Sequence, residues 1–231
     1  MSTAGHWQIR ISDCVFNMDT LVTMWIVMFV LILFAIISTK KLSIIPTKMQ
    51  VVSEWIMGFF TSTVESMVSN NGRVHVPLLS SLFLFIVTAN LIGQLPWRIL
   101  HLKTGELASP TNDINMTASM SVLVLIYYVY NGIKVKGIKY FLHSFKPIDI
   151  IVALIELLEM VIRPFTLALR LFANILAGEL LVVAFVGIFA YILPLPIMLF
   201  EVFVGFVQAL VFMMLSTAYV SLATDCGDNE H

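Results

Sequence analysis

The strongest constraint on this chain is a series of apolar runs that are each long enough to cross a lipid bilayer. They cover residues 20–39, 76–97, 116–134, 147–191 and 197–223. A helix of about 20 apolar residues crosses the ~30 Å hydrocarbon core. With 59% hydrophobic and 12% charged residues, the chain also has too little charge for a water-facing surface. We therefore predict an all-α integral membrane protein, a single membrane domain over residues 1–231, with about five transmembrane helices.

Residues 47–69 have a different pattern from these runs. Apolar residues recur there at helical spacing, and polar residues including Glu54 and Glu65 lie between them. This pattern predicts an amphipathic helix that lies at the membrane surface. Its apolar face is expected to contain Met49, Val52, Ile56, Phe59, Val64 and Met67.

The basic residues predict the orientation of the chain. Two loops are rich in them, one with Lys40, Lys41, Lys48 and Arg73 and the other with Lys134, Lys136, Lys139 and Lys146. Lysine and arginine favour the cytoplasmic side, so we expect the N-terminus outside and the C-terminus in the cytoplasm. The polar start of the chain lacks the features of a signal or transit peptide, so the first run is expected to be a retained span.

Composition also argues against several other functions. A net charge of −1 argues against a nucleic-acid partner. Cys14 and Cys226 have no spacing typical of a disulfide framework, and we expect two free thiols. No motif indicates a cofactor or a metal site. All histidines fall in predicted loops or tails, where we expect solvated side chains: His6, His75, His101, His143 and His231.

The run over residues 147–191 is too long for an upright span. As a helix, its 45 residues would extend about 67 Å, roughly twice the hydrocarbon thickness. The short turn at Pro194–Pro196 should fold residues 197–223 back against it. We therefore predict that the last two helices form a long, strongly tilted hairpin, with a possible kink at Pro164.

Charged and polar side chains follow regular faces of this hairpin. Residues 156, 163 and 170 are seven apart, as are residues 201 and 208, so each set shares a helix face. In the predicted orientation, two acidic groups lie toward opposite sides of the membrane, with Arg170 between them. The residues concerned are Glu156, Glu159, Arg163, Arg170, Asn174, Glu179, Glu201 and Gln208.

Intramembrane charges of this kind typically mark an ion path. Buried carboxylates can pass protons, whereas arginine keeps its charge and can act as a fixed barrier. A purely structural interpretation stays open: Arg163 is placed to pair with Glu159 and Glu156, and Glu179 and Glu201 with polar neighbours. Asn90 and Asn174 are more typical of hydrogen bonds between helices than of ion ligands.

The run TLALRLFANI, residues 166–175, resembles the signature of subunit a of F-type ATP synthases. NLIGQLP (90–96), SPTNDINMTASM (109–120), AGEL (177–180) and FVQALVFMMLSTAYV (206–220) follow the order expected for that family. The resemblance implies that Arg170 faces a carboxylate on a ring of c subunits and separates two half-channels. It implies that Gln208 lies near Arg170, that Glu179, Asn174 and Glu201 line the outer half-channel, and that Glu156 lies near the inner one.

Further expectations come from the same resemblance. The subunit would carry H⁺ or Na⁺ and would not be an enzyme by itself. Its partners would be the c-ring, the peripheral stalk subunit b, membrane lipid and, indirectly, the F1 sector. Glu179 stands where mitochondrial relatives tend to have histidine, which favours a bacterial plasma membrane.

Two other classes of function compete with this interpretation. A secondary transporter would use Arg170 to bind an anionic substrate, but it predicts internal repeats and broken helices, and the sequence has no evident repeat. An intramembrane enzyme ranks last, because no nucleophile–base pair or metal-binding cluster lies within the runs.

Overall fold

The computed structural model describes residues 8–11, 14–40, 46–68, 71–94, 109–136, 147–186 and 194–224. Its helices are α1 (Met18–Thr39), α2 (Lys48–Met67), α3 (Val76–Gly93), α4 (Ile114–Lys136), α5 (Pro147–Val186) and α6 (Pro194–Thr224). Two short 3₁₀ helices, η1 (Gly72–Val74) and η3 (Pro110–Asn112), lie between them. Five helices are long and apolar enough to cross a membrane: α1, α3, α4, residues 158–182 of α5, and α6. The prediction of an all-α, multi-pass membrane protein is confirmed.

A small β-hairpin precedes α1, and the sequence analysis did not foresee it. Strands β1 (Gln8–Ile11) and β2 (Cys14–Asn17) pair antiparallel, with Gln8 opposite Asn17. A two-stranded hairpin has little stability alone and a weak sequence signal. At its base, the Asn17 side-chain amide donates a 3.1 Å hydrogen bond to Asp113, just before α4.

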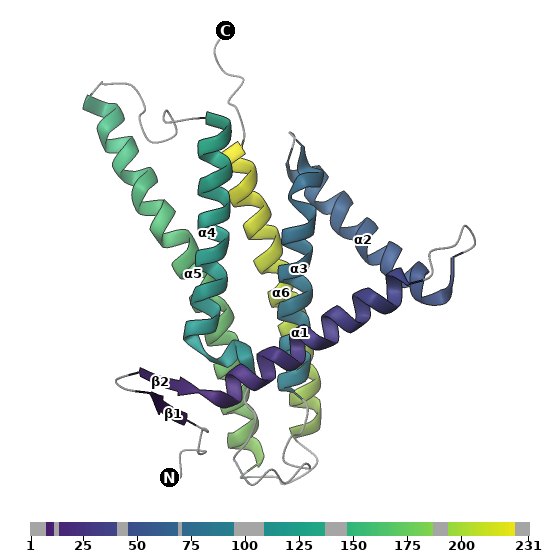
Figure 1. The fold of residues 1–231 in the computed structure, drawn as a ribbon. Helices are drawn as coiled ribbons and strands as arrows, with labels where there is room; N and C mark the ends of the chain where they lie inside the picture. The colour runs from purple at the N-terminus through teal and green to yellow at the C-terminus, as the bar shows by residue number, and fades with distance from the viewer. Residues whose placement is uncertain are drawn as a thin grey trace.

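Helices α3 to α6 form the body of the molecule (Figure 1). We call the end where α3 begins and α6 ends the upper end, and the opposite end, where α4 and α6 begin, the lower end. α5 runs obliquely past α4 and extends beyond it at both ends (Figure 1). Its 40 residues correspond to about 60 Å, longer than the hydrocarbon core is thick. The chain returns through α6, which packs against α5, α3 and α4.

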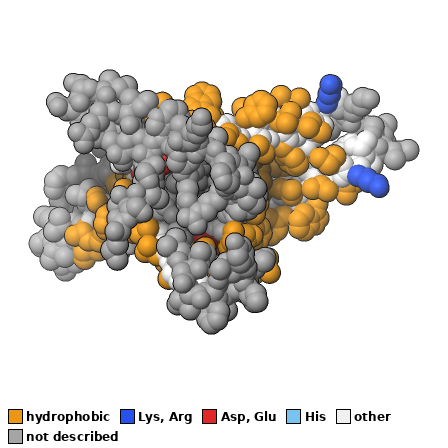
Figure 2. Space-filling model, turned by 90° about the horizontal axis from the view of Figure 1, so that it is seen from below, with side chains coloured by type: hydrophobic (Ala, Val, Ile, Leu, Met, Phe, Trp, Pro, Cys, Tyr) orange, Lys and Arg blue, Asp and Glu red, His pale blue; other side chains and the backbone are white. Residues whose placement is uncertain are grey.

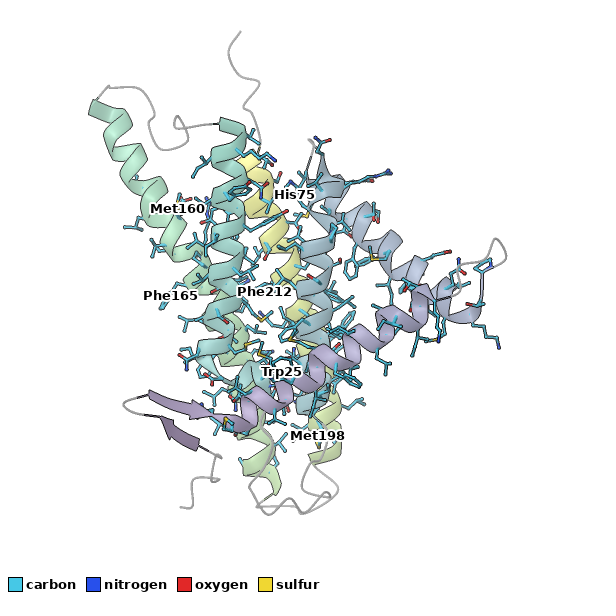
Figure 3. The ribbon with its side chains drawn as sticks, in the orientation of Figure 1. Trp25, His75, Met160, Phe165, Met198 and Phe212 are labelled. Atoms are coloured by element: carbon cyan, nitrogen blue, oxygen red, sulfur yellow. The ribbon has the colours of Figure 1, made fainter. Side chains whose placement is uncertain are left out.

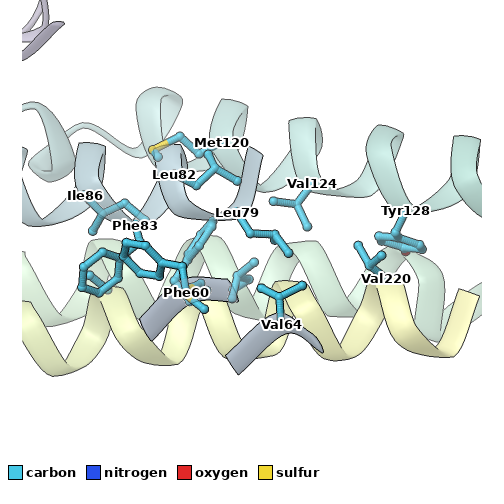
Figure 4. Close-up of a cluster of buried hydrophobic side chains, with 14 of the residues drawn as sticks. Phe60, Val64, Leu79, Leu82, Phe83, Ile86, Met120, Val124, Tyr128 and Val220 are labelled. Atoms are coloured by element: carbon cyan, nitrogen blue, oxygen red, sulfur yellow. The ribbon is translucent and has the colours of Figure 1, made fainter. Parts of the chain in front are cut away.

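The main hydrophobic core lies where α3, α4, α5 and α6 meet, and α2 adds side chains from one side. Figure 4 shows the cluster, in which Phe60 of α2 packs edge-on against Phe83 of α3 at 5.0 Å between ring centroids. Phe212 of α6 is fully buried and lies between the helices in Figure 3. The Tyr128 hydroxyl on α4 donates a 3.1 Å hydrogen bond to the Met160 carbonyl on α5. These contacts hold the body together.

Helices α1 and α2 form an arm that projects from this body. α1 crosses α3 at a large angle, and its contact is a small cluster of Val27 with Ala89 and Ile92 (Figure 1). Trp25 and Phe29 on α1 and Trp55 on α2 are strongly exposed. Seen from below in Figure 2, hydrophobic side chains cover much of the arm. An exposed hydrophobic surface of this kind is typical of contact with lipid or with an apolar surface of another protein.

The other helices cover only part of the apolar face predicted for α2. Phe60 and Val64 are buried, whereas Met49, Val52 and Phe59 are exposed. The reason is that α2 meets α3 and α6 over one narrow strip near its end and leaves its other apolar side chains uncovered. Its position at the membrane surface stays a prediction.

The expectation of a solvated His75 is wrong. His75 precedes α3 and is only 4% exposed, because Tyr127 of α4 covers it edge-on, with ring centroids 5.7 Å apart. Its Nδ1 atom lies 2.8 Å from the Tyr127 hydroxyl. Burial lowers the pKa of His75 below its ordinary value. The sequence placed this residue in a loop but did not show that α4 closes over it. His6, His101, His143 and His231 lie outside the described residues.

Candidate functional site: polar side chains along α5 and α6

Arg170 lies near the middle of α5, on the side turned away from the body. Leu167 and Leu171 are buried toward the core, whereas Arg170 and Leu169 are exposed. Phe165, on the same outer side, points away from the other helices in Figure 3. Within the described residues, Arg170 has no hydrogen bond or ion pair. The structure thus presents a cation on the outward face of α5 that no described residue of this chain pairs with.

Arg163, two helical turns before Arg170, has a different environment. It pairs with Glu159 at 2.5 Å, and its guanidinium lies 5.5 Å from the centre of the Tyr219 ring on α6. The predicted pairing of Arg163 with Glu159 is confirmed. The side chains are 29% and 50% exposed, so the ion pair contributes at most about 1 kcal/mol. Arg163 is fixed to its neighbours, whereas Arg170 is not.

Glu201 and Gln208 are the buried polar residues of α6 in this region. Only 7% of Glu201 and 9% of Gln208 is exposed. The Gln94 side chain lies near the Glu201 carboxyl and interacts with it, but the Oε1 atom of Glu201 and the Nε2 atom of Gln208 are buried without a hydrogen-bond partner among the described residues. Buried polar atoms without partners are uncommon in folded proteins and call for a functional explanation.

Gly178 on α5 makes room for Glu201. A Cβ atom built at Gly178 would lie 2.4 Å from Glu201 Oε1, closer than any side chain allows. The glycine of the AGEL motif therefore lets α5 approach α6 closely at the carboxyl group. Gln94 is a polar neighbour of Glu201 that sequence analysis had not placed in the site, and the pairing of Glu201 stays a prediction. The position of Gln94 in NLIGQLP, one helical turn after Asn90, is the signal that could have identified it.

Two contacts define how α5 and α6 lie against each other. Arg163 is level with Tyr219, and Gly178 is level with Glu201. Because the helices run antiparallel, Arg170 falls about halfway between these contacts, level with the turn of α6 that begins at Gln208. The exposed Arg170 guanidinium and the buried Gln208 amide thus lie at about the same level along the helix axes. Asn174, one turn beyond Arg170, is half-buried.

Two predicted site residues cannot be placed against the others. The side chains of Glu156 and Glu179 lie outside the described residues, although both positions belong to α5. Residue 179 follows Gly178 on α5, so its backbone lies at about the same level along the helix axis as Glu201 of α6. The structure brings Glu159 together with Arg163, and Glu201 with Gly178 and Gln94.

A second group of polar side chains joins α3, η3 and α6. The Asn90 amide donates a 3.1 Å hydrogen bond to the Gly205 carbonyl, which confirms the predicted interhelical role of Asn90. Its Oδ1 atom accepts a 2.8 Å hydrogen bond from Thr111, whose hydroxyl lies 2.7 Å from that of Ser109. Sequence analysis predicted a turn at SPTND but not its burial, because a polar turn is normally solvated.

Two hollows border these groups. One, of about 650 Å³, is apolar and lies between α3 and α6, with Asn90 and Phe203 in its wall. The other, of about 380 Å³, lies at the lower end between Asn17, Ser109 and Asp113 and the α5 residues Phe172 and Leu176. The second has polar walls that can hold water beside α5. Among the described residues, no cluster of His, Cys, Asp or Glu could hold a metal ion.

Comparison with known proteins finds matches that cover most of the chain. A family model described as ATP synthase A chain matches residues 21–221. The chain is also similar to a protein named ATP synthase subunit a from Gloeobacter violaceus. The two are 39% identical over 214 residues, which cover 92% of this chain and 86% of the relative.

Proposed function

The chain belongs to the ATP synthase A chain family, and from this premise we propose that Arg170 is the fixed charge separating two half-channels of an ion-translocating Fo subunit. The observation that carries the proposal is the setting of Arg170. It is an exposed cation on the outward face of α5, level with Gln208, and has no ion pair among the described residues. A permanent charge in a membrane needs a counter-charge. We propose a carboxylate on the c-ring, which reaches Arg170 from outside this chain.

The outer half-channel is proposed to run along the lower half of the α5–α6 hairpin. Glu201 and Gln208 are buried on one face of α6, and each has an unpartnered polar atom that can contact a passing ion or its water. Asn174 and Glu179 would complete this route from α5. Water in the polar hollow beside Phe172 and Leu176 would connect it to the aqueous phase.

The inner half-channel is proposed to lie toward the upper end, near Glu156 and Glu159. The ion pair with Arg163 makes Glu159 a weaker candidate for an ion carrier than Glu156, because its charge already has a partner. In the proposed cycle, H⁺ or Na⁺ enters from outside, binds a c-ring carboxylate, travels with the ring and leaves inward. Arg170 prevents the short path between the two routes because it does not release its proton.

The chain is proposed to act within a larger complex and not as an enzyme alone. Its partners would be the c-ring, the peripheral stalk subunit b, membrane lipid and, indirectly, the F1 sector. We place it in a bacterial plasma membrane, with its N-terminus outside and its C-terminus in the cytoplasm, on the distribution of lysine and arginine. Family membership disfavours the secondary transporter.

Arg170→Ala in the assembled complex tests the proposal. ATP-driven ion pumping in inverted membrane vesicles should be lost, while assembly and ATP hydrolysis by the soluble sector remain. Arg163→Ala is the matched control, because it removes an arginine side chain from the same helix. Its only predicted effect is the loss of a partly exposed ion pair with Glu159, which contributes little, so pumping should persist. Normal coupled pumping in Arg170→Ala would refute the assignment.

A further inference from the structure

The turn that contains Ser109 and Thr111 is buried against the lower part of α3, although polar turns of this kind are usually hydrated at the protein surface. Ser109 is 3% exposed and Thr111 is fully buried. η3 contacts α3, α4 and α5. Gly93 permits this approach, since a Cβ atom there would lie 2.3 Å from the Ser109 Cβ atom. Placing polar groups here is costly unless every hydrogen bond is made.

The hydrogen bonds at this turn run in one direction. Thr111 Oγ1 is 2.8 Å from Asn90 Oδ1, which can only accept, so the single Thr111 proton is used there. The 2.7 Å contact between the two hydroxyls is then a donation from Ser109 to Thr111, and the Ala89 carbonyl, 3.3 Å from the same Ser109 hydroxyl, is a second and more distant acceptor for its proton. Because Oδ1 is occupied, the Asn90 amide nitrogen faces α6 and donates to the Gly205 carbonyl at 3.1 Å. The chain of donors therefore passes from Ser109 through Thr111 and Asn90 to Gly205.

The acceptor at the end of this chain stands between two residues of the proposed outer half-channel. Gly205 lies one turn after Glu201 and just before Gln208 on α6, so the three share a face. The approach of Asn90 is close, since a Cβ atom at Gly205 would lie 3.2 Å from the Asn90 amide nitrogen. Asn90 also precedes Gln94, whose side chain interacts with the Glu201 carboxyl, by one turn. Anything that moves Asn90 thus acts on α6 at two neighbouring points.

We infer that Ser109 and Thr111 are positioning residues for ion translocation: through Asn90 they fix the rotation and distance of the α6 face that presents Glu201 and Gln208. Neither hydroxyl needs to contact the ion. Without the Thr111 proton, the Asn90 amide loses one of the two hydrogen bonds that fix its orientation, and its oxygen is left buried without a donor. The side chain can then swing away from the Gly205 carbonyl, and any rotamer that turns its oxygen toward that carbonyl is repelled by it. Either change would release α6 from α3. The inference rests on the proposed function, because the ion route along α6 belongs to it.

Thr111→Val tests the inference, since it removes the hydroxyl and keeps the shape. The enzyme is purified as the whole complex, reconstituted in liposomes, and ATP synthesis is followed while the pH or the Na⁺ concentration on the outer side is varied. We expect the half-saturating ion concentration per assembled complex to shift by roughly two- to tenfold, the range that one net hydrogen bond represents. Thr111→Ser keeps the proton donor and should restore the normal value.

Thr117→Val is the matched control. Thr117 is also fully buried, but its hydroxyl bonds only to the Ile114 carbonyl of its own helix. It should leave the half-saturating concentration unchanged. A residue with a merely structural role would lower the amount of assembled complex and leave this concentration unaltered. An unchanged value in Thr111→Val, or an equal shift in Thr117→Val, would overturn the inference.

Two further variants keep the test decisive. If Thr111→Val prevents assembly, Ser109→Ala decides, because it removes the first donor, together with its 3.3 Å contact to the Ala89 carbonyl, and keeps the Cβ atom that packs on Gly93. A smaller shift in the same direction supports the inference, and no shift refutes it. Arg170→Ala is measured in the same liposomes. Normal pumping there contradicts the proposed function, whereas lost pumping with no Thr111→Val shift contradicts the positioning role alone.

Discussion

Gly178→Ala is expected to disable ion translocation through steric displacement of Glu201. The new Cβ atom would lie 2.4 Å from Glu201 Oε1 and 2.5 Å from Cδ, about 1 Å short of the 3.4 Å at which ordinary contacts begin. Glu201 is 7% exposed, so its carboxyl has little free space to move into. Overpacking of this kind costs about 1–3 kcal/mol.

That cost translates into a measurable loss. Between 1 and 3 kcal/mol corresponds to roughly a 5- to 150-fold lower population of the productive arrangement. ATP synthesis driven by an imposed ion gradient, measured per assembled complex, should fall within this range. Gly58→Ala on α2 is the control, because a Cβ atom there meets nothing within 4 Å. Replacing a helical glycine by alanine should stabilise that helix by up to about 1 kcal/mol.

A second substitution identifies the clash as the cause. Glu201→Asp shortens the side chain by one methylene and draws the carboxyl away from position 178. The double variant Gly178→Ala/Glu201→Asp should therefore synthesise ATP faster than expected if the activity losses of the two single variants were independent. The reasoning is refuted if Gly178→Ala synthesises ATP normally, or if the two losses simply add.

Two further predictions concern stability. Tyr128→Phe removes the hydrogen bond to the Met160 carbonyl and should cost about 0.5–1.5 kcal/mol, seen as a lower temperature of thermal aggregation in detergent, whereas Tyr130→Phe, at an exposed tyrosine of the same helix, should change nothing. Burial lowers the pKa of His75, so the unfolded chain binds its proton more readily, and stability should fall as the pH drops below about 6.5. His75→Gln should flatten that pH dependence of the aggregation temperature; an unchanged slope would contradict it.

The helices were predictable because their signal is local. A run of apolar residues of bilayer length leaves few alternatives, so the five spanning helices followed from composition along the chain. The order of Glu159 and Arg163 predicted their ion pair for the same reason, since four residues along a helix bring the two side chains together. The long hairpin followed from the length of residues 147–191 alone.

What could not be predicted depends on contacts between distant segments. Thr111 looked like part of a solvated turn, and only the position of α3 shows that it is buried beside Asn90. His75 looked solvated until Tyr127, 52 residues later, covered it. A single glycine within an apolar helix does not indicate a close helix contact, so the role of Gly178 was not predictable from the sequence. Its role appears when α6 sets Glu201 against it.

The exposed face of α5 has a mechanical consequence for a partner that moves past it. Leu158, Val161 and Phe165 are more than half exposed and offer only dispersion contacts, each worth about 0.1–0.2 kcal/mol per atom pair and alike in all directions. Directional bonds along this face would create deep resting positions and hold a moving ring in place. The apolar side of α5 formed by these three residues therefore offers little resistance to sliding, while Arg170, further around the helix from them, supplies a charge that has no partner among the described residues.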